Sequence, residues 1–390
     1  MPRQCPYDPP ARLGELRAED PITRVRSWDG STPWLITAYE PARAALVSPA
    51  LSSNPARPGY PAVGPGDVVV PDEPQSPGVL LTMDGAEHAR LRRRLIGEFT
   101  VRRIEALRPR VEQLVDELLD AMAEGPKPAD LVSALALPLP SLVISELLGV
   151  PYADHEFFQQ HSQDTLNTEA GQEHTQRALR ELVDYLARLV LAKQTDPGDD
   201  LLSRLLEAGE LTTREVAGVG VLLLVAGHET TANQIALGAL TLLRHPDQAD
   251  ELRAANDPDA IRTAVEELLR LLTITQVGAR RVAVEDVRIG DVLIRAGEGV
   301  IIATNAANRD PAVFDHPDDY DPRRPANRHI AFGFGPHQCL GQPLARLELQ
   351  VVHPALLRRF PTMKLAVDPA ELSYRDTMPM YGVNRLPVTW

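Results

Sequence analysis

The stretch A-F-G-F-G-P-H-Q-C-L-G, residues 331–341, is the most informative part of this sequence. It holds three glycines, one proline and one of the two cysteines of the chain. Glycine lets the backbone pass close to something flat and bulky. A helix expected from Leu340 onward would place the sulfur of Cys339 near its positive end. An isolated cysteine is usually a small buried hydrophobe, but these surroundings favour a nucleophile or a metal ligand.

This loop resembles the haem-binding loop of the cytochrome P450 family, whose pattern is F-x-x-G-x-[His/Arg]-x-C-x-G. The fixed positions are filled by Phe332, Gly335, His337, Cys339 and Gly341. The resemblance implies a haem b cofactor with Cys339 as the axial thiolate of its iron, a ligand that favours O–O cleavage. It also implies haem contacts from Phe332, Gly333, His337 and Gly341.

Apolar spacing outside this loop predicts a mainly helical protein. Helical patterns occur at residues 101–122, with a break at Pro109, and at 139–148, 173–193, 200–207 and 340–360. Thr212 and Glu215 form a capping pair, followed by a predicted helix of about 32 residues, about 48 Å long. Residues 34–37 and 282–302 are typical of strands. We expect an α+β fold, mainly α with small β-sheets, in one domain over residues 1–390.

The apolar run of the long helix is interrupted by A-G-H-E-T-T-A-N, residues 226–233. A charged residue in a buried helix is costly unless it has a partner or a function, so a satisfied buried glutamate is one interpretation of this stretch. The stretch also matches the P450 pattern [A/G]-G-x-[D/E]-T-[T/S]. The resemblance implies that Ala226 and Gly227 lie over the haem and leave room for O₂ and substrate. It implies that Glu229 and Thr230 are catalytic and manage protons.

The E-x-x-R pattern occurs at several places in the chain, among them residues 105–108 and the pair Glu267 and Arg270. The first is interpreted as a solvated pair. The second precedes strand-like text and the cysteine loop, in the order of the family's motifs. Its third member would be Arg324 in Y-D-P-R-R-P, with Arg323 as the competitor. We expect these three residues to stabilise the core beneath the haem, a structural role.

The haem propionates need hydrogen-bond donors. The stretch M-D-G-A-E-H-A-R-L-R resembles the family's M-D-x-x-E-H-x-x-x-R and indicates His88 and Arg92, which are four positions apart on a helix. The family position in R-V-A-x-E-D corresponds to Arg281, with Arg280 adjacent. His337 completes this set.

A basic cluster stands out in a chain of net charge −14; it consists of Arg90, Arg92, Arg93, Arg94, Arg102 and Arg103. A solvated face is the ordinary interpretation, and a nucleic-acid patch lacks interleaved aromatic residues. The resemblance implies that an acidic ferredoxin docks on part of it. Because no flavin or nicotinamide fingerprint is evident, we expect electrons from a ferredoxin and its reductase.

The remaining features limit the location and partners of the protein. The N-terminus lacks a secretory signal, and the longest apolar run, residues 216–227, is too short to span a bilayer. Cys5 is expected to be uninvolved. We expect a cytoplasmic, monomeric protein that binds neither nucleic acid nor membrane.

The sequence therefore predicts a haem-thiolate monooxygenase of the soluble actinobacterial type. It would use O₂ to hydroxylate or epoxidise a hydrophobic small molecule, such as a natural product of secondary metabolism or a xenobiotic. Substrate contacts are expected from residues 52–81, 139–173, 223–227 and 272–277. A nitric oxide reductase of the same superfamily is the first alternative, disfavoured by the intact Glu229–Thr230 pair. A haem-based gas sensor or carrier is the second, disfavoured because nothing suggests a signalling module.

Overall fold

The computed structural model describes residues 1, 3, 8–62, 64, 80–164, 172–325, 328–376 and 378–390. Cys5 and much of the proline-rich stretch expected to contact substrate, residues 63 and 65–79, lie outside the described residues. So do residues 165–171 of the second expected contact region. The helices are α1 (Ala11–Glu19), α2 (Tyr39–Val47), α3 (Gly85–Ile96), α4 (Val101–Glu105), α5 (Arg108–Glu124), α6 (Pro138–Leu148), α7 (His155–Asp164), α8 (Gln172–Thr195), α9 (Leu201–Glu207), α10 (Thr213–Arg244), α11 (Pro246–Ala254), α12 (Pro258–Leu272), α13 (Thr304–Ala307) and α14 (Gln342–Arg359).

The strands are short and form three small sheets. They are β1 (Ile22–Arg24), β2 (Trp34–Ile36), β3 (Leu51–Ser52), β4 (Ala129–Asp130), β5 (Ala279–Ala283), β6 (Val287–Ile289), β7 (Val292–Ile294), β8 (Gly299–Ile302), β9 (Lys364–Leu365) and β10 (Pro387–Thr389). The largest sheet has the order β1-β2-β8-β5-β3. Within it β2 and β8 are parallel, with Trp34 opposite Val300. The other sheets are β4-β10-β9 and the hairpin β6-β7. The predicted class, mainly α with small β-sheets, is confirmed.

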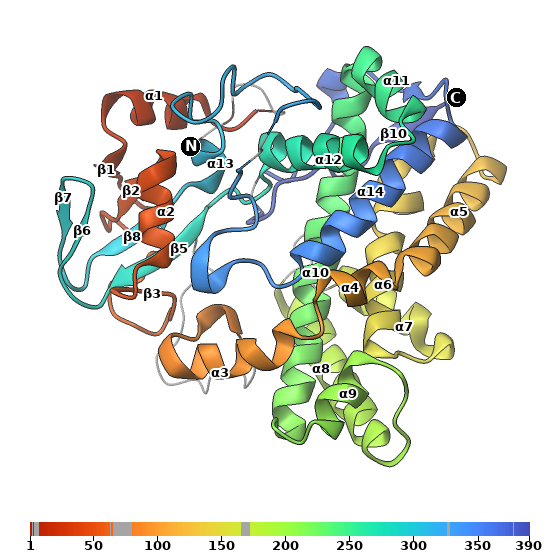
Figure 1. The fold of residues 1–390 in the computed structure, drawn as a ribbon, viewed down its shortest axis with the longest axis horizontal. Coiled ribbons are helices and arrows are strands. Elements are labelled where there is room, and N and C mark those ends of the chain that lie inside the picture. The colour runs from red at the N-terminus through yellow and green to blue at the C-terminus, as the bar shows by residue number, and fades with distance from the viewer. Residues whose placement is uncertain are drawn as a thin grey trace.

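The largest sheet and most of the helices lie in different halves of the molecule (Figure 1). The half with β1, β2, β5 and β8 also holds α1 and α2, whereas α5, α6, α10 and α14 gather in the other. Both halves have their own apolar core: the larger one is built on the helices, and the smaller one on the sheet and α2. Among the helices of the described residues, none combines the length and apolar character needed to cross a bilayer.

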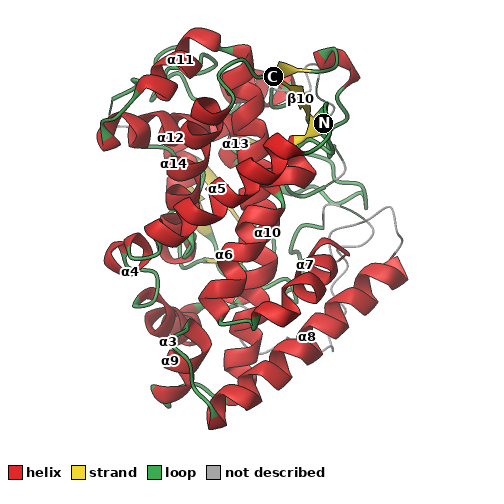
Figure 2. Cartoon of the chain, turned by 90° about the vertical axis from the view of Figure 1, so that its right-hand side faces the viewer, coloured by secondary structure: helices red, strands yellow, loops and turns green. Residues whose placement is uncertain are grey.

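Helix α10 passes through the middle of the helical half (Figures 1 and 2). It begins where the sequence predicts, because Thr212 Oγ1 accepts from Glu215 N at 3.2 Å and Glu215 Oε2 accepts from Thr212 N at 2.8 Å. Its 32 residues span about 48 Å. It packs against α6, α8 and α14, and this enclosure explains why so little of its sequence is polar.

The other predicted elements also form close to their expected ends. Pro109 separates α4 from α5, where it occupies the first turn that tolerates proline. Helix α14 begins two residues after the predicted Leu340, because Gly341 is its N-cap. Residues 282–302 divide into β5 to β8. A π-helical turn, Val132–Ala136, precedes α6 and has no signal in the sequence pattern.

Candidate functional site

The cysteine loop is shaped by glycines that no other residue could replace without strain. Gly333 and Gly335 have positive φ angles of 72° and 76°, a region that side chains disfavour. A Cβ on Gly335 would also lie 2.7 Å from Val47 Cγ1. The loop closes on itself where Cys339 N donates to Phe332 O at 2.8 Å. The side chain of Phe332 is covered by the Arg346 guanidinium, 4.6 Å from the ring centre.

The sulfur of Cys339 lies in a setting that suits a thiolate ligand. Cys339 is a free cysteine whose side chain is accessible, although it lies deep in the fold. Burial raises the pKa of the thiol. The N–H groups of Gly341 and Gln342, which begin α14, donate toward the sulfur, and Arg92 and Arg346 add positive charge. These groups favour the anionic sulfur, and a bound metal cation would do so further.

Positively charged and protonatable side chains gather beside this loop. The rings of His88, on α3, and His337 lie 4.1 Å apart. A ring nitrogen of His337 lies 3.3 Å from Ser53 Oγ and 4.0 Å from Asp84. Burial lowers the pKa of His337 to about 4, and Arg281, His88 and Arg92 lower it too, against Asp84. Burial likewise lowers the pKa of His88.

This cluster is short of negative charge. Arg281 is buried, and its Nη1 donates to the carbonyl of Arg280 at 2.7 Å. Neither Arg92 nor Arg281 forms an ion pair with a carboxylate of the described residues. The buried Nε2 of His88 has no hydrogen-bond partner there either. A buried donor without a partner is costly, so these residues suit a ligand that brings anionic oxygens. The haem propionates fit that requirement, and the accessible sulfur of Cys339 fits the iron.

The middle of helix α10 is exposed where the 226–233 motif begins. Val225 and Ala226 are exposed although the residues on both sides are mostly buried. Open space must therefore lie against this stretch, and α14, which follows the cysteine loop, packs on the same helix. A Cβ on Gly227 would meet Ile144 Cδ1 at 3.2 Å. Thr230, one turn later, is half-buried, and its Oγ1 donates to Ala226 O at 2.6 Å.

Glu229 forms an ion pair with Arg375, a residue that the sequence analysis did not single out. Its Oε1 accepts from Arg375 Nη1 at 3.1 Å, and both side chains are largely buried. Burial raises the pKa of Glu229, while Arg375 opposes this by charge and hydrogen bonding. His228 has a structural contact instead, from Nε2 to Leu137 O at 3.1 Å.

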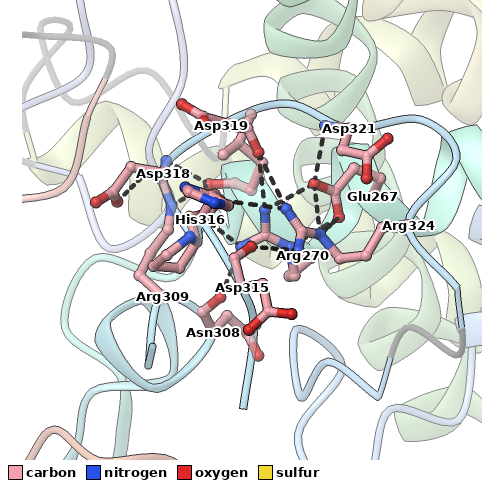
Figure 3. Close-up of polar contacts among 12 residues, drawn as sticks. Glu267, Arg270, Asn308, Arg309, Asp315, His316, Asp318, Asp319, Asp321 and Arg324 are labelled. Atoms are coloured by element: carbon pink, nitrogen blue, oxygen red, sulfur yellow. Dashed lines mark hydrogen bonds and ion pairs between the residues drawn. The ribbon is translucent and has the colours of Figure 1, made fainter. Parts of the chain in front are cut away.

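Glu267, Arg270 and Arg324 form one buried network, shown in Figure 3. Glu267 accepts twice from Arg270 at 2.7 Å, and Arg324 Nε lies 3.1 and 3.0 Å from its two oxygens. The remaining donors of the two arginines reach backbone carbonyls; they belong to Asn308, Asp315, His316, Pro317 and Asp319. The expected competitor, Arg323, pairs with Glu251 at the surface.

The structure thus brings the sequence-predicted residues into three groups. The cysteine loop gathers His88, Arg92, Arg281 and His337; α10 carries the open stretch and the acid; the Glu267 network is separate. Arg280 lies apart and stacks over Tyr60. Arg375 and Asp84 were not identified from the sequence as residues of the site. The spacing within a motif cannot reveal Arg375, which lies 146 positions from Glu229, whereas Asp84 stands within the M-D-G-A-E-H stretch itself.

Comparisons with known proteins agree with this geometry. The family model described as Cytochrome P450 matches residues 259–377. The chain is 50% identical to Cytochrome P450-SU2 of Streptomyces griseolus over 387 residues, 99% of this chain and 94% of the relative. The crystal structure of GfsF, a P450 of Streptomyces halstedii, matches with a TM-score of 0.94 at 48% identity and covers 100% of this chain and 98% of that one.

A further solved structure holds a ligand. The mycinamicin VIII C21 methyl hydroxylase of Micromonospora griseorubida, bound to mycinamicin VIII, matches with a TM-score of 0.89 at 43% identity and covers 100% of this chain and 99% of that one. These relatives match nearly the full chain at 43–50% identity, which is sufficient to assign the family. The chain belongs to the cytochrome P450 family, as a haem b-thiolate monooxygenase of the actinobacterial type.

Proposed function

We propose that this enzyme takes electrons from a ferredoxin and its reductase and uses O₂ to hydroxylate or epoxidise a hydrophobic natural product or xenobiotic. The observation that carries the proposal is the acid–alcohol pair Glu229 and Thr230, one turn from the open stretch of α10. A relative whose name specifies hydroxylation of the methyl group of a natural product supports the substrate class.

In this proposal each residue of the site has a definite task. Haem, when bound, supplies the activation of O₂. Cys339 would hold its iron, with the N–H groups of Gly341 and Gln342 stabilising the thiolate. The donors for its propionates would be His88, Arg92, Arg281 and His337. Phe332 and Gly333 shape the loop, and the small Ala226 and Gly227 keep space free against α10.

Glu229 and Thr230 would move protons toward the reacting oxygen. Glu229 is buried with a raised pKa, so its protonated form is easier to reach than that of an exposed glutamate, which suits a group that takes up and releases protons. The Thr230 hydroxyl donates to a carbonyl of its own helix and keeps its acceptor side free. A hydroxyl held this way can accept a proton or a hydrogen bond on that side without leaving the helix.

The ferredoxin would dock on only part of the predicted basic cluster. Arg90, Arg94 and Arg103 are paired with Glu215, Glu210 and Glu98, and the charge of Arg92 acts on Cys339. Arg93 and Arg102 are exposed and form no ion pair within the described residues, and exposed Ile96 and Val101 lie between them in sequence. Exposed cations with apolar neighbours suit an acidic protein partner.

Charge reversal tests this docking surface. Arg93→Glu and Arg102→Glu should raise the KM for ferredoxin severalfold and flatten its dependence on salt, with kcat at saturating ferredoxin nearly unchanged. Arg288→Glu, on the distant β6-β7 hairpin, is the matched control and should change neither. If all three variants behave alike, the ferredoxin docks elsewhere.

An optical titration tests the substrate class. Purified ferric enzyme would be mixed with a panel of hydrophobic natural products, and a change in the haem absorption would report binding. A saturable change with one class, followed by an oxygenated product, supports the proposal. Binding without any oxygenated product, with a competent ferredoxin present, contradicts it. The nitric oxide reductase alternative would then be tested by nitric oxide consumption with a nicotinamide cofactor alone.

A further inference from the structure

The ion pair between Glu229 and Arg375 links the acid of α10 to the C-terminal part of the chain. The two side chains are 10% and 15% exposed, and their polar atoms are 3.1 Å apart. A pair this enclosed is only weakly screened by water. The ion pair with Arg375 must therefore break before the carboxylate of Glu229 can turn to another position along the helix.

Arg375 is held in place by contacts at both of its peptide groups. Its N–H donates to Gly382 O at 2.9 Å, and its carbonyl accepts from Gln276 Nε2 at 2.9 Å. Gly382 packs so closely on α10 that a Cβ there would lie 2.0 Å from Asn233 Oδ1. Asn233 lies one turn beyond Glu229, so the loop and the acid are fixed to the same helix.

The same loop is tied to the segment that follows α12. Besides Arg375, the Gln276 side chain donates to the carbonyls of Asp376 at 3.3 Å and Met378 at 2.7 Å. The Gln276 N–H donates to Pro379 O at 2.9 Å. Gln276 belongs to residues 272–277, where substrate contacts are expected. The position of Arg375 thus depends on a segment next to the proposed substrate site.

The charged groups near the ion pair influence the pKa of Glu229. Arg375 acts on Glu229 directly and also lowers the pKa of His228, its neighbour on α10. His228 is buried, with a pKa of about 4, and stays neutral. On the loop side, Asp376 and Arg3 interact with one another. Arg375 is therefore the cation whose removal should change Glu229 most.

We propose that Arg375 is a positioning residue for proton delivery: it holds Glu229 ionised and fixed in the ion pair until the carboxylate takes up a proton. Protonation ends the ion pair and frees the carboxyl group to turn along α10, and loss of the proton restores the pair. This proposal rests on the proposed role of Glu229 as the proton-carrying acid.

The test compares Arg375→Gln with Arg375→Lys, Glu229→Gln and the surface control Arg385→Gln. Infrared difference spectra of the ferric holoenzyme would follow the protonated carboxyl of Glu229, identified by its loss in Glu229→Gln, as pH is varied. Loss of the Arg375 cation should shift its midpoint upward by about one pH unit or more, a tenfold change in the protonation equilibrium. Arg375→Lys and Arg385→Gln should stay near the wild-type value.

A second readout is the pH profile of coupling, the fraction of electrons that reach product. Its midpoint should move with the infrared midpoint in Arg375→Gln and be rescued by Arg375→Lys. An unmoved infrared midpoint in a folded Arg375→Gln enzyme overturns the inference, while changed coupling in Glu229→Gln would leave the proposed role of Glu229 standing. Unchanged coupling and pH profile in Glu229→Gln would instead remove the proposed role itself.

Discussion

Replacing Glu267 by glutamine should destabilise the protein far more than the same change at Glu105. Both residues begin an E-x-x-R pattern, but Glu267 and Arg270 are fully buried, whereas Glu105 and Arg108 are partly exposed at 47% and 33%. Glu267→Gln leaves two buried guanidinium groups, those of Arg270 and Arg324, without their carboxylate. Breaking a buried pair in this way costs about 3–5 kcal/mol, a large part of a typical net stability of about 5–15 kcal/mol.

Thermal unfolding of the ferric holoprotein measures this difference. With about 2.1 cal/mol/K of unfolding entropy per residue, 390 residues give about 0.8 kcal/mol/K. Glu267→Gln should therefore lower Tm by about 4–6 °C. An exposed pair is worth about 0–1 kcal/mol, so Glu105→Gln should lower Tm by about 1 °C or less. Equal shifts in the two variants would refute the reasoning from burial.

A gentler pair of variants tests the same network if Glu267→Gln does not accumulate. Arg324→Met removes one guanidinium but leaves the Glu267–Arg270 pair balanced, and it should cost about 2–3 kcal/mol through lost charged hydrogen bonds. Arg323→Met removes only a surface pair with Glu251 and should cost about 1 kcal/mol or less. Arg323→Met matching Arg324→Met would show that the third member was wrongly assigned.

Three other predictions concern single positions. Gly238→Ala places a Cβ 2.5 Å from the buried His353 ring and should lower the unfolding free energy by about 1–3 kcal/mol. In Gly220→Ala the nearest neighbour of the new Cβ is a leucine methyl at 3.5 Å, so the unfolding free energy should rise by about 0.5–1 kcal/mol. Denaturant unfolding in which both variants change stability in the same direction contradicts this prediction. Burial raises the pKa of Glu348 from 4.5 to about 8, so the stability gained by its protonation is complete below pH 4.5 and is lost as pH rises to about 8. Glu348→Gln should therefore raise the unfolding free energy at pH 7 by about 3 kcal/mol, with a gain that vanishes near pH 4.5; a gain independent of pH would be inconsistent with that titration. Thr230→Ala should keep the haem but divert electrons to peroxide, measured as peroxide formed per electron consumed, and fully coupled hydroxylation would disprove the assigned role.

Local chemistry explains which parts of the structure the sequence could predict. The start of α10 follows from Thr212 and Glu215, three positions apart, and the break at Pro109 follows from its missing N–H. Neither depends on distant contacts. The cysteine loop is also local, since its glycines and the start of α14 determine its shape.

Long-range packing explains what the sequence could not predict. The sequence named Arg324 rather than Arg323 through the family resemblance alone, because the contact with Glu267 is made from a loop 57 positions away. The pairing of Glu229 with Arg375 depends on the C-terminal loop folding onto α10. Which arginines of the basic cluster remain exposed depends on acids elsewhere, such as Glu210 and Glu215. These contacts cannot be predicted from the spacing of residues along the sequence.

The most direct test of the central claim is the absorption spectrum of the reduced enzyme with carbon monoxide, for the wild type and for Cys339→Ser. The account predicts a thiolate-ligated spectrum in the wild type and its loss in Cys339→Ser, while the neighbouring Gln338→Ser retains it. An unchanged spectrum in Cys339→Ser, with haem bound, would contradict the assignment of Cys339 as the haem ligand.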